Sequence, residues 1–192
     1  GMVALVTGGS RGIGAAIVRR LARDGAAVAF TYAASGAKAQ ALRREVDESG
    51  GRALALMADS ASETELQGAV QSTVERLGPL DLFVSNAGIF QASPLDRMTI
   101  EDLDRIIAVN VRAVFIGIQA AARVMRDGGR IVTIGSSAAN RIAFPGISAY
   151  SMTKAAVQGL VRGLAVDLAS RAITVNNVQP GPIATDINPA AG

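Results

Sequence analysis

A tyrosine and a lysine stand four residues apart in the segment Tyr150-Ser151-Met152-Thr153-Lys154. The segment opens a stretch of helical period, so this spacing sets the phenol and the ammonium on one helix face, one turn apart. A phenol has a pKa of about 10, and it exchanges a proton near neutral pH only where a neighbouring positive charge favours the phenolate. We therefore interpret Tyr150 as a general acid or base that Lys154 assists. The alternative is an ordinary pair on an amphipathic surface helix.

Two serines, Ser136 and Ser137, follow the predicted strand that ends at Gly135. In a parallel sheet the carboxyl ends of neighbouring strands meet at one edge, which brings this strand end beside the same cleft as Tyr150. A serine hydroxyl there can donate to a substrate carbonyl oxygen. When a hydride arrives at the carbonyl carbon, negative charge develops on that oxygen, and the hydroxyl and a proton from Tyr150 would stabilise it together.

A glycine-rich loop follows the first predicted strand and opens the first predicted helix. The glycines permit a tight turn and a close backbone approach, so a pyrophosphate can sit against unpaired N–H groups at the positive end of the helix. We predict a dinucleotide as the occupant, and the alternative is a turn required only for packing. The residues assigned to this site are Gly8, Ser10, Arg11, Gly12, Ile13 and Gly14.

The residues after the second predicted strand favour NADP(H) over NAD(H). Folds that select NAD place an acidic residue about 20 positions beyond the glycine loop, where it bonds to the adenosine ribose. This chain has Tyr32 and Ala33 there, and no carboxylate to repel a 2′-phosphate. The cation of Arg11 and the hydroxyls of Ser10 and Ser35 could hold that phosphate. Alternatively, Arg11 is a solvated loop cation.

Short β-branched runs alternate along the chain with longer runs of helical period. This alternation predicts a Rossmann-like α/β fold, a doubly wound parallel sheet flanked by helices in three layers, in one domain over residues 1–192. Ligands of such sheets bind beyond the carboxyl ends of the strands. The expected strands are 3–7, 27–32, 52–58, 82–85, 130–135 and 173–178, and the expected helices are 12–24, 36–49, 62–77, 99–126 and 148–170.

The composition excludes several kinds of chemistry. The 192 residues include no cysteine and no histidine, which rules out disulfides, thiolate nucleophiles, Ser-His-Asp triads and ordinary zinc sites, so we expect no metal. Aromatic residues make up only 4% of the chain, which gives nucleic-acid bases few surfaces on which to stack. The arginines are scattered, and no apolar run approaches a membrane span. We therefore expect a cytoplasmic protein with no nucleic-acid or membrane partner.

Taken together, these motifs resemble the short-chain dehydrogenase/reductase family. The likeness spans the whole chain and consists of the Thr-Gly-x-x-x-Gly-x-Gly loop, an Asn-Ala-Gly after the fourth strand, a serine after the fifth and Tyr-x-x-x-Lys. The family's catalytic serine usually lies thirteen residues before the tyrosine, which selects Ser137 over Ser136. Asn110 matches the helix asparagine that helps to hold a water in the family's proton relay. The resemblance thus implies a catalytic tetrad of Asn110, Ser137, Tyr150 and Lys154.

The resemblance also implies further contacts with the cofactor. Asp59 and Ser60 are expected at the adenine ring, and Lys154 at the nicotinamide ribose. Asn110 and Asn86 have plainer alternatives, since the first could stitch helices together and the second could stabilise a turn. The remaining implied residues are Asn86, Ala87 and Gly88 on the adenosine side, and Pro180, Gly181, Ile183 and Thr185 at the nicotinamide carboxamide.

The chain departs from the family pattern in two places. Ser85 stands where many members have a second asparagine, which changes hydrogen bonding at a strand end. Family members also continue into a substrate-covering loop, a helix and a seventh strand, so we expect those parts to be missing at the C-terminus. A homodimer or homotetramer is implied, with helices 99–126 and 148–170 packing across subunits. The alternative is that the small residues within 155–163 pack against the parent sheet.

The pattern is most similar to bacterial 3-oxoacyl-carrier-protein reductase-like members of the family. The implied activity is NADPH-dependent transfer of a hydride between the nicotinamide and a ketone or secondary alcohol, with a small-molecule carbonyl compound or alcohol as substrate. A rival hypothesis is a regulatory protein that has kept the fold and binds cyclic-di-GMP, since residues 182–190 also resemble cyclic-di-GMP-binding members. The two phosphates of that ligand could use the same glycine loop and Arg11.

Overall fold

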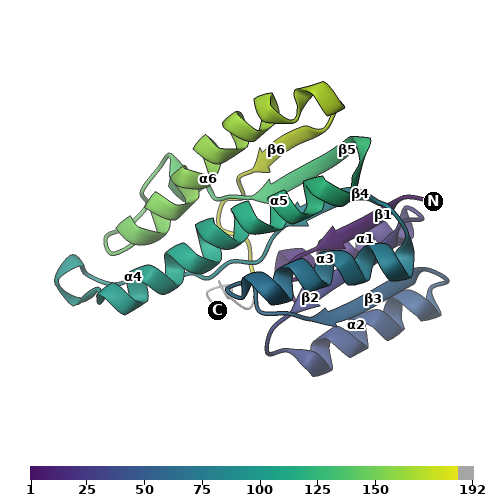
Figure 1. The fold of residues 1–192 in the computed structure, drawn as a ribbon. Coiled ribbons are helices and arrows are strands. Elements are labelled where there is room, and N and C mark those ends of the chain that lie inside the picture. Colours follow the sequence, from purple (N-terminus) through teal and green to yellow (C-terminus); the bar gives the residue numbers. More distant parts are fainter. Residues whose placement is uncertain (186–192) are drawn as a thin grey trace.

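The computed structural model describes residues 1–185 and contains one sheet of six parallel strands (Figure 1). Their order is β3-β2-β1-β4-β5-β6, so the winding reverses between β1 and β4. The strands are β1 (Val3–Val6), β2 (Ala27–Tyr32), β3 (Arg52–Met57), β4 (Leu80–Ser85), β5 (Met125–Ile134) and β6 (Thr174–Val178). The α-helices are α1 (Gly12–Arg23), α2 (Gly36–Glu48), α3 (Glu63–Leu77), α4 (Ile100–Ile107), α5 (Ala113–Val124) and α6 (Ser148–Asp167). Shorter turns are the 3₁₀ turns η1 (Leu95–Arg97), η3 (Ser137–Ala139) and η4 (Ala169–Arg171), and the π turn η2 (Ala108–Arg112).

Alternate strand residues face opposite layers of helices. Val6 and Phe30 lie in the core that α1 and α2 cover, whereas Leu5 and Phe83 lie in the core that α3, α5 and α6 cover. Leu5 and Val6 are neighbours in β1, and successive side chains of a strand point to opposite faces. Figure 1 shows α3, α5 and α6 running across the near side of the sheet. The predicted doubly wound, three-layer Rossmann-like fold is therefore confirmed.

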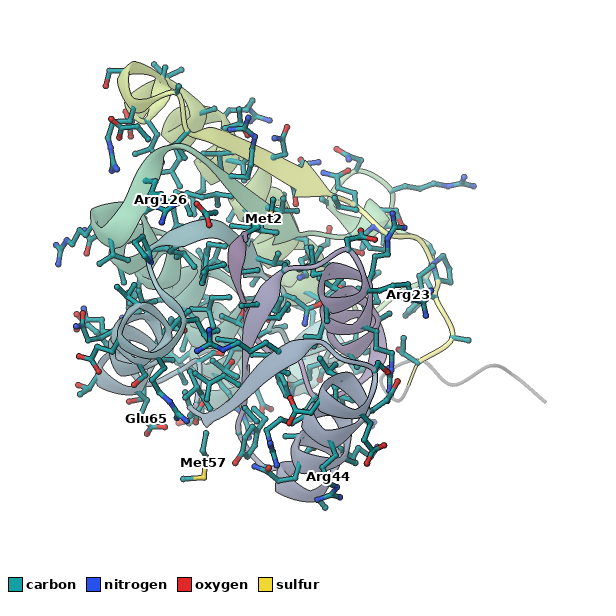
Figure 2. All side chains as sticks on the ribbon, turned by 90° about the vertical axis from the view of Figure 1, so that its right-hand side faces the viewer. Met2, Arg23, Arg44, Met57, Glu65 and Arg126 are labelled. Carbon is teal, nitrogen blue, oxygen red and sulfur yellow. The ribbon has the colours of Figure 1, made fainter. Side chains whose placement is uncertain are left out.

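Charged side chains are spread over the surface of the molecule. Arg23 ends α1, Arg44 lies in α2 and Arg126 lies in β5, and Figure 2 shows these three side chains in separate regions of the surface. Exposed ion pairs such as Arg19 with Glu45, whose atoms approach to 2.8 Å, contribute roughly 0–1 kcal/mol each. The net charge of +3 therefore does not come from one basic face.

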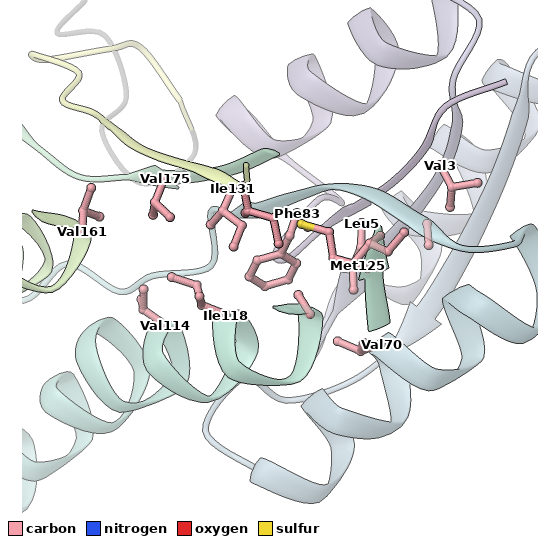
Figure 3. Packing of buried hydrophobic residues seen from close by; sticks show 14 of the residues in the cluster. Val3, Leu5, Val70, Phe83, Val114, Ile118, Met125, Ile131, Val161 and Val175 are labelled. Atoms are coloured by element: carbon pink, nitrogen blue, oxygen red, sulfur yellow. The ribbon is translucent and has the colours of Figure 1, made fainter. Parts of the chain in front are cut away.

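Phe83 fills the centre of the larger core. Its side chain is fully buried, and Figure 3 shows the ring among Leu5, Ile118 and Ile131. A Cβ atom added at Gly117 would lie only 2.8 Å from Phe83 Cζ. Gly117 therefore lets α5 pack close to the ring.

The single helix predicted over 99–126 is wrong in one respect, because the π turn η2 interrupts it. The side chain of Asn110, inside this turn, is hydrogen-bonded to the backbone of Ile89 outside the helix. A side chain held in this way favours an extra residue in the turn, and such π bulges often mark functional sites. The interruption places Asn110 next to the loop that follows β4.

Strands β4 and β5 also begin earlier than expected. Met125 pairs with Leu80 and Arg130 pairs with Leu82, so residues 126–129 bulge out between the two pairs. Gly128 in this bulge has a φ of 78°, a conformation that glycine adopts without strain. The helix predicted over 148–170 is shorter than expected, because α6 ends at Asp167 and the short turn η4 follows.

The segment Ile100–Val124 is 25 residues long and has a mean hydropathy of 1.4 in its most apolar window, so by length and composition alone it could cross a membrane. Half of that window is buried inside the protein. Val114 and Ile118 of this segment pack against the sheet. A helix that packs in a protein core can have this same length and hydropathy, so we interpret the segment as a core helix.

Replacement of Phe83 by alanine should lower the free energy of unfolding by about 3–5 kcal/mol, because it leaves a cavity in the larger core. Phe115→Ala is the matched control, since this phenylalanine is exposed on α5 and its loss should change stability by roughly 0.5 kcal/mol or less. Urea unfolding followed by circular dichroism measures both values. Equal losses in the two variants would contradict the central place of Phe83.

Candidate active site

A cleft of about 550 Å³ opens at the carboxyl edge of the sheet. Its walls come from the segments that follow β1, β2, β3, β4 and β5, and from residues 180–185 after β6. The structure brings every residue predicted to bind the cofactor into these walls, together with Ser137. Asn110 is the one predicted site residue that does not line the cleft. The roles of the individual residues stay predictions, but the fold places them where those roles can be performed.

The glycine loop is held in a tight turn against the loop after β4. Gly8 has a φ of 63°, and its N–H donates to Thr31 Oγ1 over 3.0 Å. The Asn86 amide donates to the carbonyl oxygens of Thr7 and Gly8 over 2.9 and 3.0 Å. A Cβ atom at Gly14 would lie 2.5 Å from Asn86 Nδ2 and would also collide with the Gly8 carbonyl oxygen. Only glycine at position 14 therefore lets α1 approach the loop this closely.

The first turn of α1 presents uncapped N–H groups. Arg11 is the N-cap residue, its side chain makes no capping hydrogen bond, and the first turn contains no acidic residue. Free N–H groups at the positive end of a helix bind phosphate, so this cradle fits the pyrophosphate of a dinucleotide. Asn86 supports the cradle from the β4 side, which is the turn-stabilising role considered for it.

The loop after β3 is fixed by a residue that sequence analysis missed. Asp59 and Ser60 line the cleft here, and the Asp59 N–H donates to Glu65 Oε2 over 2.9 Å. Glu65 lies in the first turn of α3, where Ser62 is the N-cap residue and accepts from the Glu65 N–H. A serine followed three residues later by glutamate is the pattern of a capping box, so the signal was present in the sequence.

The two serines after β5 have different surroundings. Ser136 Oγ accepts a hydrogen bond from the Ala138 N–H over 3.1 Å and so caps η3. Ser137 is exposed in the cleft, and its hydroxyl bonds to no other residue in the described range 1–185. The Ser136 hydroxyl keeps its O–H donor but is held in place by the cap, whereas the more exposed Ser137 hydroxyl is free to turn toward a substrate oxygen. The geometry therefore favours Ser137, the serine selected by its spacing from Tyr150.

Lys154 is buried next to Tyr150. Only 7% of the lysine is exposed, and its Nζ lies 5.7 Å from the centre of the Tyr150 ring. The ammonium donates to the carbonyl oxygen of Ile134 over 3.0 Å. Burial lowers the pKa of Lys154 from 10.5 to about 8. The group thus remains positive near neutral pH.

Asn110 joins the loop after β4 to helix α6. Its Oδ1 accepts from the Ile89 N–H over 2.9 Å, and its Nδ2 donates to the Ile89 carbonyl oxygen over 2.9 Å and to Thr153 Oγ1 over 3.2 Å. Thr153 Oγ1 in turn donates to the carbonyl oxygen of Tyr150 over 2.7 Å. Both side-chain N–H donors of Asn110 therefore bond to other segments. This agrees with the alternative that Asn110 serves to link helices together. If a water of the predicted proton relay binds at Asn110, it must therefore donate to an oxygen atom of this residue.

Sequence analysis did not single out Thr153 or Ile89. Thr153 is fully buried, and it carries the contact from Asn110 to the backbone of Tyr150. The sequence did offer a sign of this role, because Thr153 has a hydroxyl and lies directly before Lys154 within the Tyr-x-x-x-Lys motif. Ile89 contributes only backbone groups, so its side-chain type offered no signal.

A tyrosine next to a buried lysine, beside a glycine-rich loop at the carboxyl edge of a doubly wound sheet, is an arrangement typical of α/β oxidoreductases. Comparison with known families gives the same class. The family model for short chain dehydrogenases matches residues 2–192, and the chain belongs to that family.

Individual relatives are similar over the whole chain. It is 46% identical over 192 residues to the cyclic-di-GMP-binding biofilm dispersal mediator protein of Escherichia coli (strain K12), and covers 77% of that protein. A solved short-chain dehydrogenase/reductase from Serratia marcescens BCRC 10948 is 56% identical with a TM-score of 0.98, and 78% of it is covered. A short chain dehydrogenase from Burkholderia cenocepacia J2315, solved in complex with NADP, is 52% identical with a TM-score of 0.97, and 78% of it is covered.

These matches confirm both resemblances inferred from the motifs, to the family and to its cyclic-di-GMP-binding members. All of this chain is covered in each of the three relatives. Residues 186–190, which formed part of the second resemblance, lie outside the described residues.

Lys154→Met should make the ligand-free protein more stable below pH 8, by on the order of 3 kcal/mol at most, because the variant buries no ammonium. The unfolded chain holds the lysine proton up to a pH near 10.5, whereas the folded chain releases it near 8. The wild type therefore recovers stability as the pH rises between these two values, and the advantage of the variant shrinks. Urea unfolding across this range measures the difference.

Lys38→Met in α2 is the matched control, because Lys38 is the exposed lysine of this chain. Its effect on stability should not follow the same pH dependence. A constant difference between Lys154→Met and the wild type from below pH 8 to above 10.5 would show that Lys154 does not titrate as a buried ammonium.

Proposed function

We propose that the protein reduces ketones to secondary alcohols with NADPH, the reaction class of the 3-oxoacyl-carrier-protein reductases. The observation that carries this proposal is the convergence of Tyr150, Lys154 and the free Ser137 hydroxyl in one cleft with the glycine cradle. A carbonyl compound placed there meets a hydroxyl that orients its oxygen and a phenol that protonates it. The same groups serve the reverse oxidation of an alcohol.

Each residue of the site has its own part in the proposed reduction. When bound, the reduced nicotinamide supplies the hydride that the carbonyl carbon receives. Ser137 donates a hydrogen bond to the carbonyl oxygen, and Tyr150 transfers its phenolic proton to that oxygen. The resulting phenolate is stabilised by the Lys154 ammonium until a proton returns from solvent. Asn110 and Thr153 hold the backbone of α6 in place at Tyr150.

Two observations support NADPH over NADH. Tyr32 lines the cleft at the end of β2, where a carboxylate would repel a 2′-phosphate, and the cationic Arg11 lines the same cleft. The relative from Burkholderia cenocepacia was crystallised with NADP. The preference follows from charge, because a phosphate monoester needs a cation and no opposing carboxylate.

A second candidate function is the binding of cyclic-di-GMP, which the name of the Escherichia coli relative ascribes to that protein. Its two phosphates would need the same glycine cradle, so it should displace NADPH from this chain. Fluorescence titration of the NADPH complex with cyclic-di-GMP tests this. Unchanged NADPH fluorescence at saturating cyclic-di-GMP would exclude it from the cleft.

We also propose that the chain forms a homodimer or homotetramer through α6. The small residues Ala155, Ala156, Gly159 and Gly163 are exposed on this helix, so the alternative that they pack against the parent sheet is wrong. The exposed side chain of Met152 lies on the same helix. Small side chains let two helices approach closely, which supports an interface here.

Tyr150→Phe should reduce the rate of ketone reduction at least about a hundredfold, because it removes the proton donor. The affinity for NADPH should change little, since the ring and its neighbours are kept. Absorbance of NADPH measures turnover, and its fluorescence measures binding. Substantial turnover in this variant would reject Tyr150 as the acid.

Arg11→Ala should raise KM for NADPH about tenfold or more and leave KM for NADH nearly unchanged, because a hydrogen bond to a charged phosphate is lost. Arg23→Ala is the matched control, since Arg23 lies at the other end of α1 (Figure 2). Steady-state kinetics with both cofactors measure the ratio. Equal losses with NADPH and NADH would remove Arg11 from phosphate recognition.

A further inference from the structure

Three aromatic rings meet at the end of the cleft that contains Tyr150. The Phe90 ring stands edge-on to the Tyr150 ring, with centroids 5.0 Å apart and planes at 76°. Phe144 stands edge-on to Phe90 at 6.5 Å and 67°. The chain has five phenylalanines, two tyrosines and no tryptophan, so three of its seven aromatic rings gather at this one place.

These rings form an open apolar surface and not a closed core. Phe90 is 41% exposed and Phe144 is 50% exposed, and both line the cleft. Ile183, 47% exposed, lines the cleft from the segment after β6. Adjoining exposed apolar side chains in a concave site mark a place where a ligand replaces water.

The charges around the cleft restrict what that ligand can be. Among residues 1–185 the charged side chains that line it are Arg11, Asp59, Arg105, Arg141 and Lys154. Asp59, the one carboxylate among these described residues, follows β3, whereas Tyr150 lies beside the strand end of β5. Strands β3 and β5 are four positions apart in the sheet, or roughly 19 Å at the usual strand spacing. Within residues 1–185, the aromatic end therefore offers no carboxylate to pair with a cationic amine.

We propose that the physiological substrate is an uncharged or anionic ketone that carries an aromatic ring within a few bonds of its carbonyl carbon. The substrate ring packs against Phe90 and Phe144 while the carbonyl oxygen faces Tyr150 and Ser137. An edge-on or offset contact between aromatic rings adds about 0.5–1.5 kcal/mol beyond the burial of area alone, which a saturated ring of the same size does not gain. This inference rests on the ketone reduction proposed above.

The test compares benzylacetone with its ring-hydrogenated analogue, whose carbonyl group has the same intrinsic reactivity because the ring is not conjugated to it. With saturating NADPH, kcat/KM of the wild type should be about three to ten times higher for benzylacetone. Phe144→Leu should reduce this ratio to about one, mainly through KM. Phe90→Leu should reduce it as well, and because this ring touches Tyr150 it should also lower kcat for both ketones.

Phe115→Leu is the matched control, because Phe115 is an exposed phenylalanine of α5 that does not line the cleft. It should keep the wild-type ratio. The thermal midpoints of the Phe90 and Phe144 variants should match that of the wild type, since both side chains are already partly exposed.

The outcomes separate this inference from the function on which it rests. Reduction of both ketones at equal kcat/KM, or a ratio that survives in Phe144→Leu, overturns the aromatic substrate class and leaves ketone reduction standing. Reduction of other ketones but of neither member of the pair overturns it in the same way. A failure to oxidise NADPH with any ketone in a broad panel overturns both proposals.

Discussion

The side-chain amide of Asn110 holds together the two segments that carry the candidate chemistry. It bonds to both backbone groups of Ile89 and, through Thr153, to the backbone of Tyr150. The amide is almost wholly buried, and a buried polar group with all its donors occupied fixes geometry because any movement leaves one unpaired. Gly88 lies in the same contact, since a Cβ atom there would lie 3.3 Å from Asn110 Oδ1 and 3.6 Å from Lys154 Nζ. The loop after β4 and the start of α6 therefore keep one relative position.

That fixed position explains how a buried ammonium is useful despite its cost. Burial destabilises the charged form of Lys154, as its lowered pKa shows. The same removal of water strengthens the electrostatic effect of the ammonium on a nearby phenol. The burial that lowers the stability of the fold thus also strengthens the interaction between the Lys154 ammonium and the Tyr150 side chain.

Most of the fold could be predicted from local patterns, because strand runs and helical periods are properties of neighbouring residues. Contacts between distant segments could not. The period of residues 99–126 does not reveal the π turn, since its cause is the bond from Asn110 to Ile89. The difference between Ser136 and Ser137 depends on a cap that only the folded turn forms. The contact between Phe90 and Tyr150 joins the loop after β4 to helix α6, so no spacing in the sequence signals it.

The π turn η2 also sets the rotational phase of the long helix. Each α-helical residue advances about 100° around the axis, so Ile106 and Val114, eight positions apart, would point about 80° apart in an unbroken helix. One extra residue taken up by a π turn reduces the offset to about 20°, and both side chains are buried. Loss of one residue from 108–112 would therefore keep the buried residues of α4 and α5 on one side of the long helix while it withdrew the amide from the β4 loop. Deletion of a single codon could therefore remove the candidate catalytic arrangement from a chain of this fold and still let the chain fold.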